Sequence, residues 1–339
     1  MTRADEIAAL AAIPAPTGAE DARLRWIEQR IAHLPGTRER DAVGNLVWRF
    51  TPDSPELLVM VHVDTVFDDA TPLAIRRDGD DLVGPGVGDN AAAVLTLIWA
   101  LDAMPSIPSR LAIAFTVGEE GLGNLRGAHA ACAELQPAMV IALEGHGLDD
   151  IITEHVGSVR AKVTITGPGG HSWWDRATPS AIHALVKLAD DLADGGANIG
   201  TISGGSTVNA IASLGEMMVE RRSLNEPDLE AFVVRLGELA ATPPLRLETA
   251  VLGRRRAGQI ARDHPLVVSV RAAHQRLGLL GRLGSGSTDA NAAVACGIPA
   301  VALGCARGSG MHTVHERIQL ESLQLGRRQV TAVIRAVLD

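Results

Sequence analysis

Short apolar runs alternate with helix-like segments along much of the chain. The apolar runs have the length of buried parallel strands and cover residues 57–61, 111–117, 138–143 and 299–303. Helical patterns lie around them, near residues 21–32, after Asp89, after Asn124 and near residues 264–277. This alternation predicts an α/β fold, in which a doubly wound mixed sheet lies between helices.

The middle of the chain follows a different pattern. It predicts, in order, a strand at 159–166, a helix at 179–192, alternating segments at 198–211 and 216–224, a helix at 227–240 and a strand at 245–252. Such an α+β unit has the size of a small domain. We therefore predict a discontinuous catalytic domain, residues 1–156 and 253–339, with residues 157–252 inserted as a smaller domain.

Each apolar run stops at or shortly before a side chain that can bind metal or carry a proton. These side chains are His62, Glu119, Glu120, Glu144 and His312. Open α/β sheets bind ligands at the carboxyl ends of their parallel strands. We therefore expect these residues to gather at one edge of one sheet. Each alone has a structural alternative: a hydrogen-bonded pair with Asp64 for His62, a solvated acidic turn for the glutamates and a surface position for His312.

Two further positions keep alternatives open. Asp89 follows the glycine-rich segment 84–88, which matches neither the dinucleotide nor the P-loop pattern. Asp89 is therefore either the N-cap of the following helix or a ligand that the glycines bring close to a strand end. Near the end of the chain, His312 and His315 compete as the last imidazole.

The spacing of the acidic residues suggests a division of roles. Residues two apart on a strand share a face, so Asp64 can hold one ring nitrogen of His62 while the other binds metal. Neighbouring side chains in extended backbone diverge. One of Glu119 and Glu120 can therefore bind metal while the other is available for proton transfer.

Together the candidates form a set of nitrogen and oxygen ligands without cysteine. The set is His62, Asp89, Glu120, Glu144 and His312. Such a set suits a pair of hydrolytic zinc ions bridged by one carboxylate and an activated water, and Mn²⁺ or Co²⁺ could replace Zn²⁺.

Composition and charge exclude several other classes of protein. The 31 Lys and Arg against 40 Asp and Glu give a net charge of −9, which argues against nucleic acid as a partner. The three cysteines show no metal or disulfide spacing, which favours a reducing compartment. The N-terminus does not resemble a signal peptide, and the apolar run 91–101 is too short to span a membrane. We expect a cytoplasmic protein without a membrane partner.

Ordered motifs across nearly the whole chain resemble those of a known enzyme family. The motifs lie at residues 13–18, 62–66, 88–90, 119–123, 167–172, 204–211, 287–291 and 312–316. The family is that of the dinuclear zinc peptidases and deacylases, which includes peptidase T, glutamate carboxypeptidase, acetylornithine deacetylase and succinyl-diaminopimelate desuccinylase.

The resemblance implies a role for each candidate in the catalytic domain. It places His62 and Glu144 on one metal ion, Glu120 and His312 on the other, Asp89 between the two ions, and Glu119 as the general base. It also selects His312 over His315, because the family motif has His followed four residues later by Glu, as in His312 and Glu316.

The resemblance also implies roles for the inserted domain as a lid and a dimerisation surface. His171, in a glycine-rich loop, would reach the partner's site in a homodimer and polarise the scissile carbonyl. Asn209 and Arg222 would contact substrate. Arg222 suits a free carboxylate through two parallel hydrogen bonds, although Arg221 lies beside it.

The implied activity is hydrolysis of the amide bond of small peptides by a metal-activated water with Glu119 as base. Aminopeptidase, carboxypeptidase and N-acyl amino acid deacylase all stay open as expectations. A serine hydrolase is disfavoured because the chain has no GxSxG motif. A metal- or peptide-binding module without catalysis is the non-enzyme alternative, and it would have no need for Glu119.

Overall fold

The computed structural model describes residues 2–339, which divide into two compact units. Unit 1 runs up to His155 and resumes from Gly258 to Asp339, and unit 2 is Val156–Ala257. Unit 2 extends beyond the expected residues 157–252 because its last strand continues to Arg255.

Unit 1 holds most of the helices and a large sheet. Its helices are α1 (Arg3–Ala11), α2 (Asp21–Arg30), η1 (Val87–Ala92), α3 (Ala93–Asp102), η2 (Gly121–Gly123), α4 (Arg126–Leu135), α7 (Pro265–Leu277), α8 (Ala290–Ala295) and α9 (Ser322–Leu338). The strands of its large sheet are β1 (Thr37–Arg40), β2 (Leu46–Arg49), β3 (Leu57–His62), β6 (Leu111–Thr116), β7 (Met139–Glu144), β8 (Asp150–His155), β15 (Gly258–Gln259), β16 (Arg282–Gly286) and β17 (Ala300–Gly304). A small sheet comprises β4 (Arg76–Asp78), β5 (Asp81–Val83), β18 (Gly308–Ser309) and β19 (Arg317–Gln319).

The large sheet is mixed and has a parallel centre. Its strand order is β1-β2-β6-β3-β7-β17-β8-β15, with β16 paired to β8. Strands β6, β3, β7 and β17 run parallel, whereas β2 and β8 pair with them antiparallel. The carboxyl ends of the four parallel strands therefore meet at one edge, and this edge carries His62 and Glu144.

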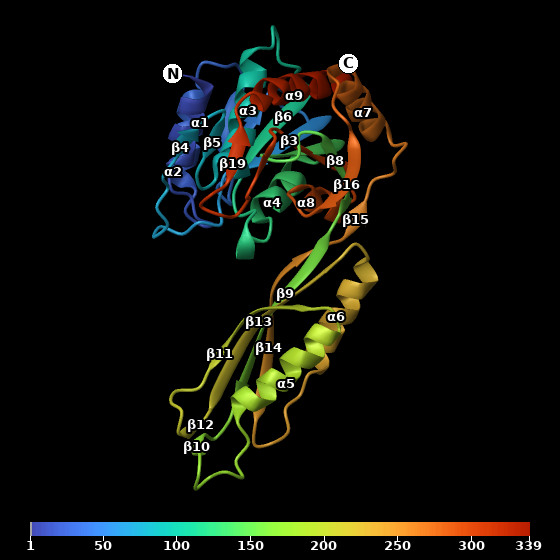
Figure 1. Ribbon diagram of the computed structural model, residues 1–339. Helices are drawn as coiled ribbons and strands as arrows, with labels where there is room; N and C mark the ends of the chain where they lie inside the picture. The colour runs from blue at the N-terminus through green and yellow to red at the C-terminus, as the bar shows by residue number, and fades with distance from the viewer. Residues whose placement is uncertain (1) are drawn as a thin grey trace. The chain divides into compact units, whose positions relative to one another are not determined.

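Two hydrophobic layers explain why the central strands read as continuous apolar runs. Every residue of β3 is buried. Val59 and Val61 face a core shared with α1, α2, α3, α7 and α9, whereas Leu58 and Met60 face a core shared with α4 and α8. Figure 1 shows these helices on the two sides of the sheet. The predicted doubly wound α/β fold is confirmed.

Unit 2 is a four-stranded antiparallel sheet with two helices on one face (Figure 1). Its elements are β9 (Gly157–Thr166), β10 (Gly170–His171), α5 (Ala181–Asp194), β11 (Asn198–Gly204), β12 (Ala210–Ile211), β13 (Leu214–Ser223), α6 (Glu226–Glu238) and β14 (Arg246–Arg255). The main sheet has the order β11-β13-β9-β14, and β10 pairs with β12 in a small separate sheet.

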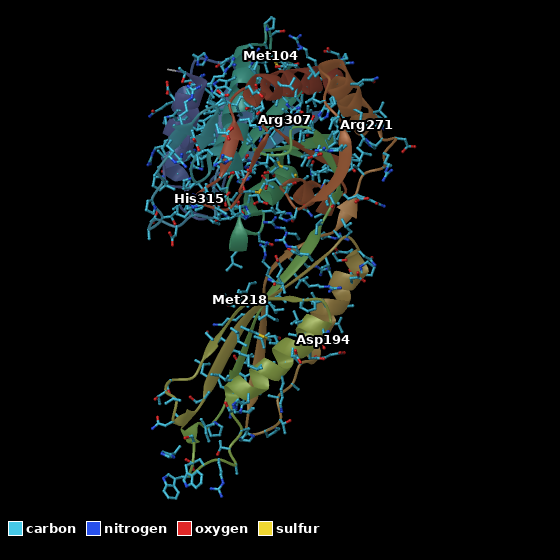
Figure 2. The ribbon with its side chains drawn as sticks, viewed as in Figure 1. Met104, Asp194, Met218, Arg271, Arg307 and His315 are labelled. Carbon is cyan, nitrogen blue, oxygen red and sulfur yellow. The ribbon has the colours of Figure 1, made fainter. Side chains whose placement is uncertain are left out.

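The two faces of the unit 2 sheet differ in polarity. On β9, Val159 and Val163 pack against the helices, whereas Arg160 and Lys162 point to the opposite face. Met218, the neighbour of Lys162 on β13, lies on that open face (Figure 2). Alternation along the strands thus builds one apolar core and one charged surface.

Among residues 2–339, no helix is both long enough and apolar enough to cross a membrane.

Candidate metal centre

The predicted side chains of unit 1 converge at the carboxyl edge of the parallel strands. Their potential ligand atoms form three overlapping groups, and within each group the atoms lie within 4.8 Å of one another. The groups are His62–Glu119–Glu120, His62–Asp89–Glu144 and Asp89–Glu120–His312. Residues that are far apart along the chain thus form one continuous cluster.

Asp89 lies between two imidazoles. Its Oδ1 is 3.0 Å from Nε2 of His62, and its Oδ2 is 3.1 Å from Nε2 of His312. Asp89 and Asn90 have non-helical backbone angles, and α3 begins only at Ala93. Asp89 is therefore not the N-cap of α3, and its two oxygens are arranged as in a bridging carboxylate.

Each imidazole faces one further carboxylate. Oε2 of Glu144 is 3.5 Å from Nε2 of His62, and Oε1 of Glu120 is 3.3 Å from Nε2 of His312. These are the two pairs that the family resemblance assigns to the two metal ions. His312 is half exposed whereas His62 is buried, so one side of the cluster is open to solvent.

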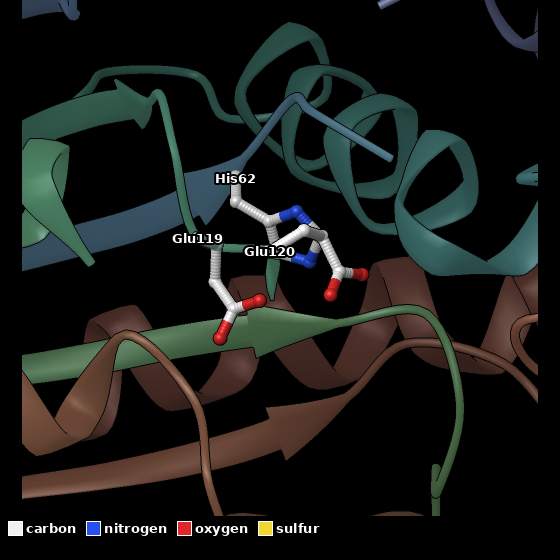
Figure 3. Close-up of side chains that lie close together, drawn as sticks. All are labelled: His62, Glu119 and Glu120. Carbon is white, nitrogen blue, oxygen red and sulfur yellow. The ribbon is translucent and has the colours of Figure 1, made fainter. Parts of the chain in front are cut away.

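Asp64 fixes the loop that follows β6. Its carboxylate accepts hydrogen bonds from the backbone N–H of Glu119 at 3.0 Å, the N–H of Glu120 at 2.9 Å and the hydroxyl of Thr17 at 2.8 Å. Figure 3 shows the carboxylates of Glu119 and Glu120 diverging beside the imidazole of His62. The buried Asp64 therefore fixes the backbone from which the Glu119 and Glu120 side chains extend.

Asp64 lies on the Nδ1 side of His62, opposite the side that faces Asp89 and Glu144. Nδ1 of His62 is closest to the backbone carbonyl of Asp64, at 3.2 Å, and its distance to the carboxylate oxygen Oδ1 is 3.6 Å. Nδ1 donates its proton to that carbonyl, so Nε2 is directed toward Asp89 and Glu144.

Glu316 and His146 hold the backbone of Asp89 in place, a role that the sequence pattern did not predict. Oε1 of Glu316 accepts the backbone N–H of Asp89 at 2.9 Å and lies 2.6 Å from Nε2 of His146. A Cβ atom at Gly88 would lie 2.3 Å from His146 and 2.7 Å from Glu316, so a larger residue there would displace this pair. The sequence did contain a sign of this role, because His146 lies two residues after the candidate ligand Glu144.

A buried arginine also lies close to the cluster. Arg23, on α2, donates to the carbonyl of Val63 at 2.9 Å and to the carbonyl of Ile13 at 2.8 Å. Burial lowers its pKa to about 10, against the attraction of Asp64 and Asp89. It thus ties the segment after His62 to the segment that follows α1, and no local pattern predicted it.

The carboxylates change the protonation of both imidazoles. Burial opposes charge on His62, but the carboxylates of Asp64, Asp89 and Glu144 outweigh it and raise the pKa of His62 well above its usual value. Hydrogen bonds to Asp89 and Glu120 raise the pKa of His312 to about 10.

The pKa values of Glu144 and Asp89, the two carboxylates that face His62, shift in opposite directions. Burial raises the pKa of Glu144 to about 7, although contact with His62 opposes this shift. Burial also opposes the ionisation of Asp89, but the two histidines hold its pKa well below the usual range. The cluster therefore retains protons that a cation could displace.

The donor set fits divalent metal ions. Two imidazoles face an excess of buried or half-buried carboxylates, namely Asp64, Asp89, Glu119, Glu120 and Glu144. Nε2 of His62, at 3.0 Å from Oδ1, and Nε2 of His312, at 3.1 Å from Oδ2, leave the two Asp89 oxygens directed at the positions that two cations would share. Nitrogen and carboxylate ligands without cysteine suit Zn²⁺, Mn²⁺ or Co²⁺.

The remaining candidates belong to unit 2. His171 is exposed on β10, and the N–H of the next residue, Ser172, donates to the backbone carbonyl of Asn209 at 3.0 Å, so these candidates lie on neighbouring segments. Arg222 is exposed on β13, where its Nε donates to Glu220 at 2.9 Å. Its guanidinium is thus partly engaged, and its role toward substrate stays a prediction.

Comparison with known proteins places the chain in a family. A profile of peptidase family M20/M25/M40 matches residues 58–336. The chain belongs to this family. The suspected resemblance is thereby confirmed, and the protein is a metallohydrolase.

Relatives cover almost the full length of the chain. A protein of Pyrococcus abyssi, to which hydrolysis of LysW-lysine and LysW-ornithine is provisionally ascribed, is 26% identical over 92% of this chain and 87% of its own. The aminopeptidase PepT of Bacillus cereus has a TM-score of 0.77 at 22% identity, covering 99% of this chain and 98% of its own. A dinuclear metal-binding peptidase of Bacillus subtilis has a TM-score of 0.67 at 16% identity, covering 98% and 97%. The two solved structures support the fold.

Proposed function

We propose that this M20-family protein hydrolyses the amide bond of small peptides with a dinuclear metal centre. The observation that carries the proposal is Asp89, whose two oxygens face two imidazoles that each face one more carboxylate. The residues that would hold the ions are His62, Asp89, Glu120, Glu144 and His312. When bound, two divalent ions would polarise the scissile carbonyl and lower the pKa of a water molecule. Zinc is the ion that we favour.

Glu119 is the residue that we assign to proton transfer. Its side chain is buried in the same cluster as His62 and Glu120 but diverges from that of Glu120. Its backbone is held by Asp64. Glu119 would take a proton from the attacking water and deliver it to the leaving amine.

Unit 2 would supply substrate contacts. By resemblance to the family, we propose that unit 2 forms a lid and a homodimer surface, and that His171 of one protomer polarises the carbonyl bound by its partner. Asn209 and Arg222 would contact substrate, with Arg222 directed to a free carboxylate. We propose a cytoplasmic homodimer.

A deacylase is the second candidate. It is supported by the Pyrococcus abyssi relative, whose provisional name places lysine or ornithine in the substrate. The same cluster would serve both activities, because each breaks an amide bond at a carbonyl.

A test combines metal removal with a substrate panel. Protein stripped with a chelator should hydrolyse nothing, and reloading with Zn²⁺, Mn²⁺ or Co²⁺ should restore hydrolysis of a dipeptide, a tripeptide or an N-acyl amino acid. Glu119→Gln should keep its metal while turnover falls at least about 10²-fold. Full activity in metal-free protein would contradict the proposal. Loss of metal from Glu119→Gln would instead identify Glu119 as a ligand.

A further inference from the structure

The turn that carries His171 is held together by its own residues. The backbone N–H of His171 donates to the Asp175 carboxylate at 2.7 Å, and the N–H of Asp175 donates back to the His171 carbonyl at 2.9 Å. The N–H of Thr178 then donates to the Asp175 carbonyl at 2.7 Å. Residues 171–175 therefore form one braced unit.

The same turn fixes the imidazole of His171. Nδ1 accepts the backbone N–H of Trp173 at 3.1 Å and lies 3.4 Å from the N–H of Trp174. A ring nitrogen that accepts these bonds carries no proton, so the neutral ring carries its proton on Nε2. That nitrogen is then a donor, as a group that polarises a carbonyl must be.

Two tryptophans occupy the exposed side of this turn. Trp173 is 63% exposed and Trp174 is 77% exposed. In contrast, Trp48 and Trp99 are buried. The chain contains five tryptophans, four phenylalanines and no tyrosine, so two adjacent exposed indoles are a large share of its aromatic surface. Exposed indoles of this kind are common where a protein binds a ligand or partner.

The indoles are oriented by their neighbours. The ring centroid of Trp174 lies 6.4 Å from that of His171, with a tilt of 41°. The Arg176 guanidinium stacks over Trp173 at 5.4 Å from the ring centroid and donates to its carbonyl. A group bound at Nε2 of His171 would thus lie within reach of at least one indole.

We propose that Trp173 and Trp174 bind an apolar group of the substrate, preferably an aromatic one, beside the scissile amide. The proposal rests on the proposed function, in which His171 contacts the carbonyl of that amide. Because His171 and the two tryptophans share one braced turn, a substrate that reaches His171 also meets the indoles. The residues define a preference for peptides or N-acyl amino acids with an aromatic side chain or acyl group.

The kinetic test compares two dipeptides, Phe-Phe and Ala-Ala. In Trp173→Ala/Trp174→Ala, the ratio of kcat/KM for Phe-Phe to that for Ala-Ala should fall by about tenfold, chiefly through KM for Phe-Phe. Val234→Ala removes an exposed apolar side chain from α6 and should leave the ratio unchanged. An unchanged ratio in the double variant would overturn the inference while leaving the proposed hydrolysis intact.

A binding measurement decides the question without turnover. In Glu119→Gln protein, addition of Phe-Phe should change tryptophan fluorescence, and the change should vanish in Glu119→Gln/Trp173→Phe/Trp174→Phe. A change that survives the replacement of both indoles would overturn the inference. So would an equal loss of activity on both dipeptides accompanied by a shift to monomer, because the indoles would then pack between copies of the chain.

Discussion

The two units arrange their charges in opposite ways. On the open face of the unit 2 sheet, Lys162 pairs with Glu216 at 2.6 Å and Arg160 pairs with Glu220 at 2.8 Å. In unit 1, carboxylates surround His62 and His312 in excess, and most of them are buried.

This difference separates a structural charge pattern from a functional one. An exposed ion pair such as Lys162–Glu216 contributes about 0–1 kcal/mol and balances its own charge. Buried carboxylates destabilise a fold by several kcal/mol unless a cation or hydrogen bonds compensate them. The acidic residues on the unit 2 face are therefore neutralised by their own partners, whereas the excess of carboxylates in the unit 1 cluster is what a bound cation would neutralise.

The largest effect is expected when a glutamate is replaced by glutamine in each unit and metal content and activity are compared. Glu120→Gln removes a proposed ligand charge, so metal content should fall and activity should drop by at least about 10²-fold. Glu216→Gln breaks an exposed pair and should leave both quantities near normal. Elemental analysis of the purified variants and initial rates measure these effects. Full metal occupancy in Glu120→Gln would remove Glu120 from the ligand set.

A smaller effect is expected from the carboxylate that holds the β6 loop. Asp64→Asn replaces a charged acceptor of three hydrogen bonds, so the free energy of unfolding should fall by about 1–3 kcal/mol for each bond lost. Lys162→Gln, on the open face of unit 2, should change it by less than about 1 kcal/mol. Urea unfolding of the metal-free variants provides the measurement. Equal effects of the two changes would show that burial of Asp64 does not matter.

The smallest expected effect is the pH dependence of the stability of the metal-free protein. His312 has a pKa of about 10 in the folded state against the usual 6.5, so its contribution to stability is complete below about pH 6.5 and is lost toward pH 10. Glu144 has a pKa of about 7 in the folded state against the usual 4.5. Its contribution to stability is therefore complete below about pH 4.5 and is lost as the pH rises to 7. Thermal unfolding in chelator should therefore show lower stability at pH 10 than at pH 6.

Metal should cancel this trend, because ligands bind cations in their deprotonated forms. The comparison at pH 6, 8 and 10 is made with and without Zn²⁺, and His312→Gln serves as the matched variant. A metal-free protein equally stable at pH 6 and pH 10 would contradict the assigned protonation of the cluster.

The central strands and their end residues could be predicted from the chain because burial leaves a local trace. Strands β3 and β6 are buried at every position, and each reads as an apolar run that a polar residue terminates. Their parallel pairing then brings His62 and the residues after Thr116 to one edge. Short polar edge strands such as β1 and β4 leave no such trace and were not predicted.

The supporting contacts could not be predicted because they join distant parts of the chain. Thr17 and Asp64 are 47 residues apart, His146 and Glu316 are 170 apart, and the contact between Asp89 and Glu316 spans 227 residues. Strand periodicity placed Asp64 beside His62, but it could not show that the backbone carbonyl of Asp64, at 3.2 Å, lies closer to Nδ1 than the carboxylate does, at 3.6 Å.

The register between β8 and β15 has a consequence for how the chain is connected. His155, the last residue of β8, is directly opposite Gly258, the first residue of β15, in an antiparallel pair. Unit 2 therefore leaves and re-enters unit 1 at the two ends of what would otherwise be a tight hairpin. In topological terms the whole of Val156–Ala257 is a greatly enlarged turn. A two-residue loop could close the same gap, so unit 2 could be removed or replaced without a change in the strand order of the large sheet.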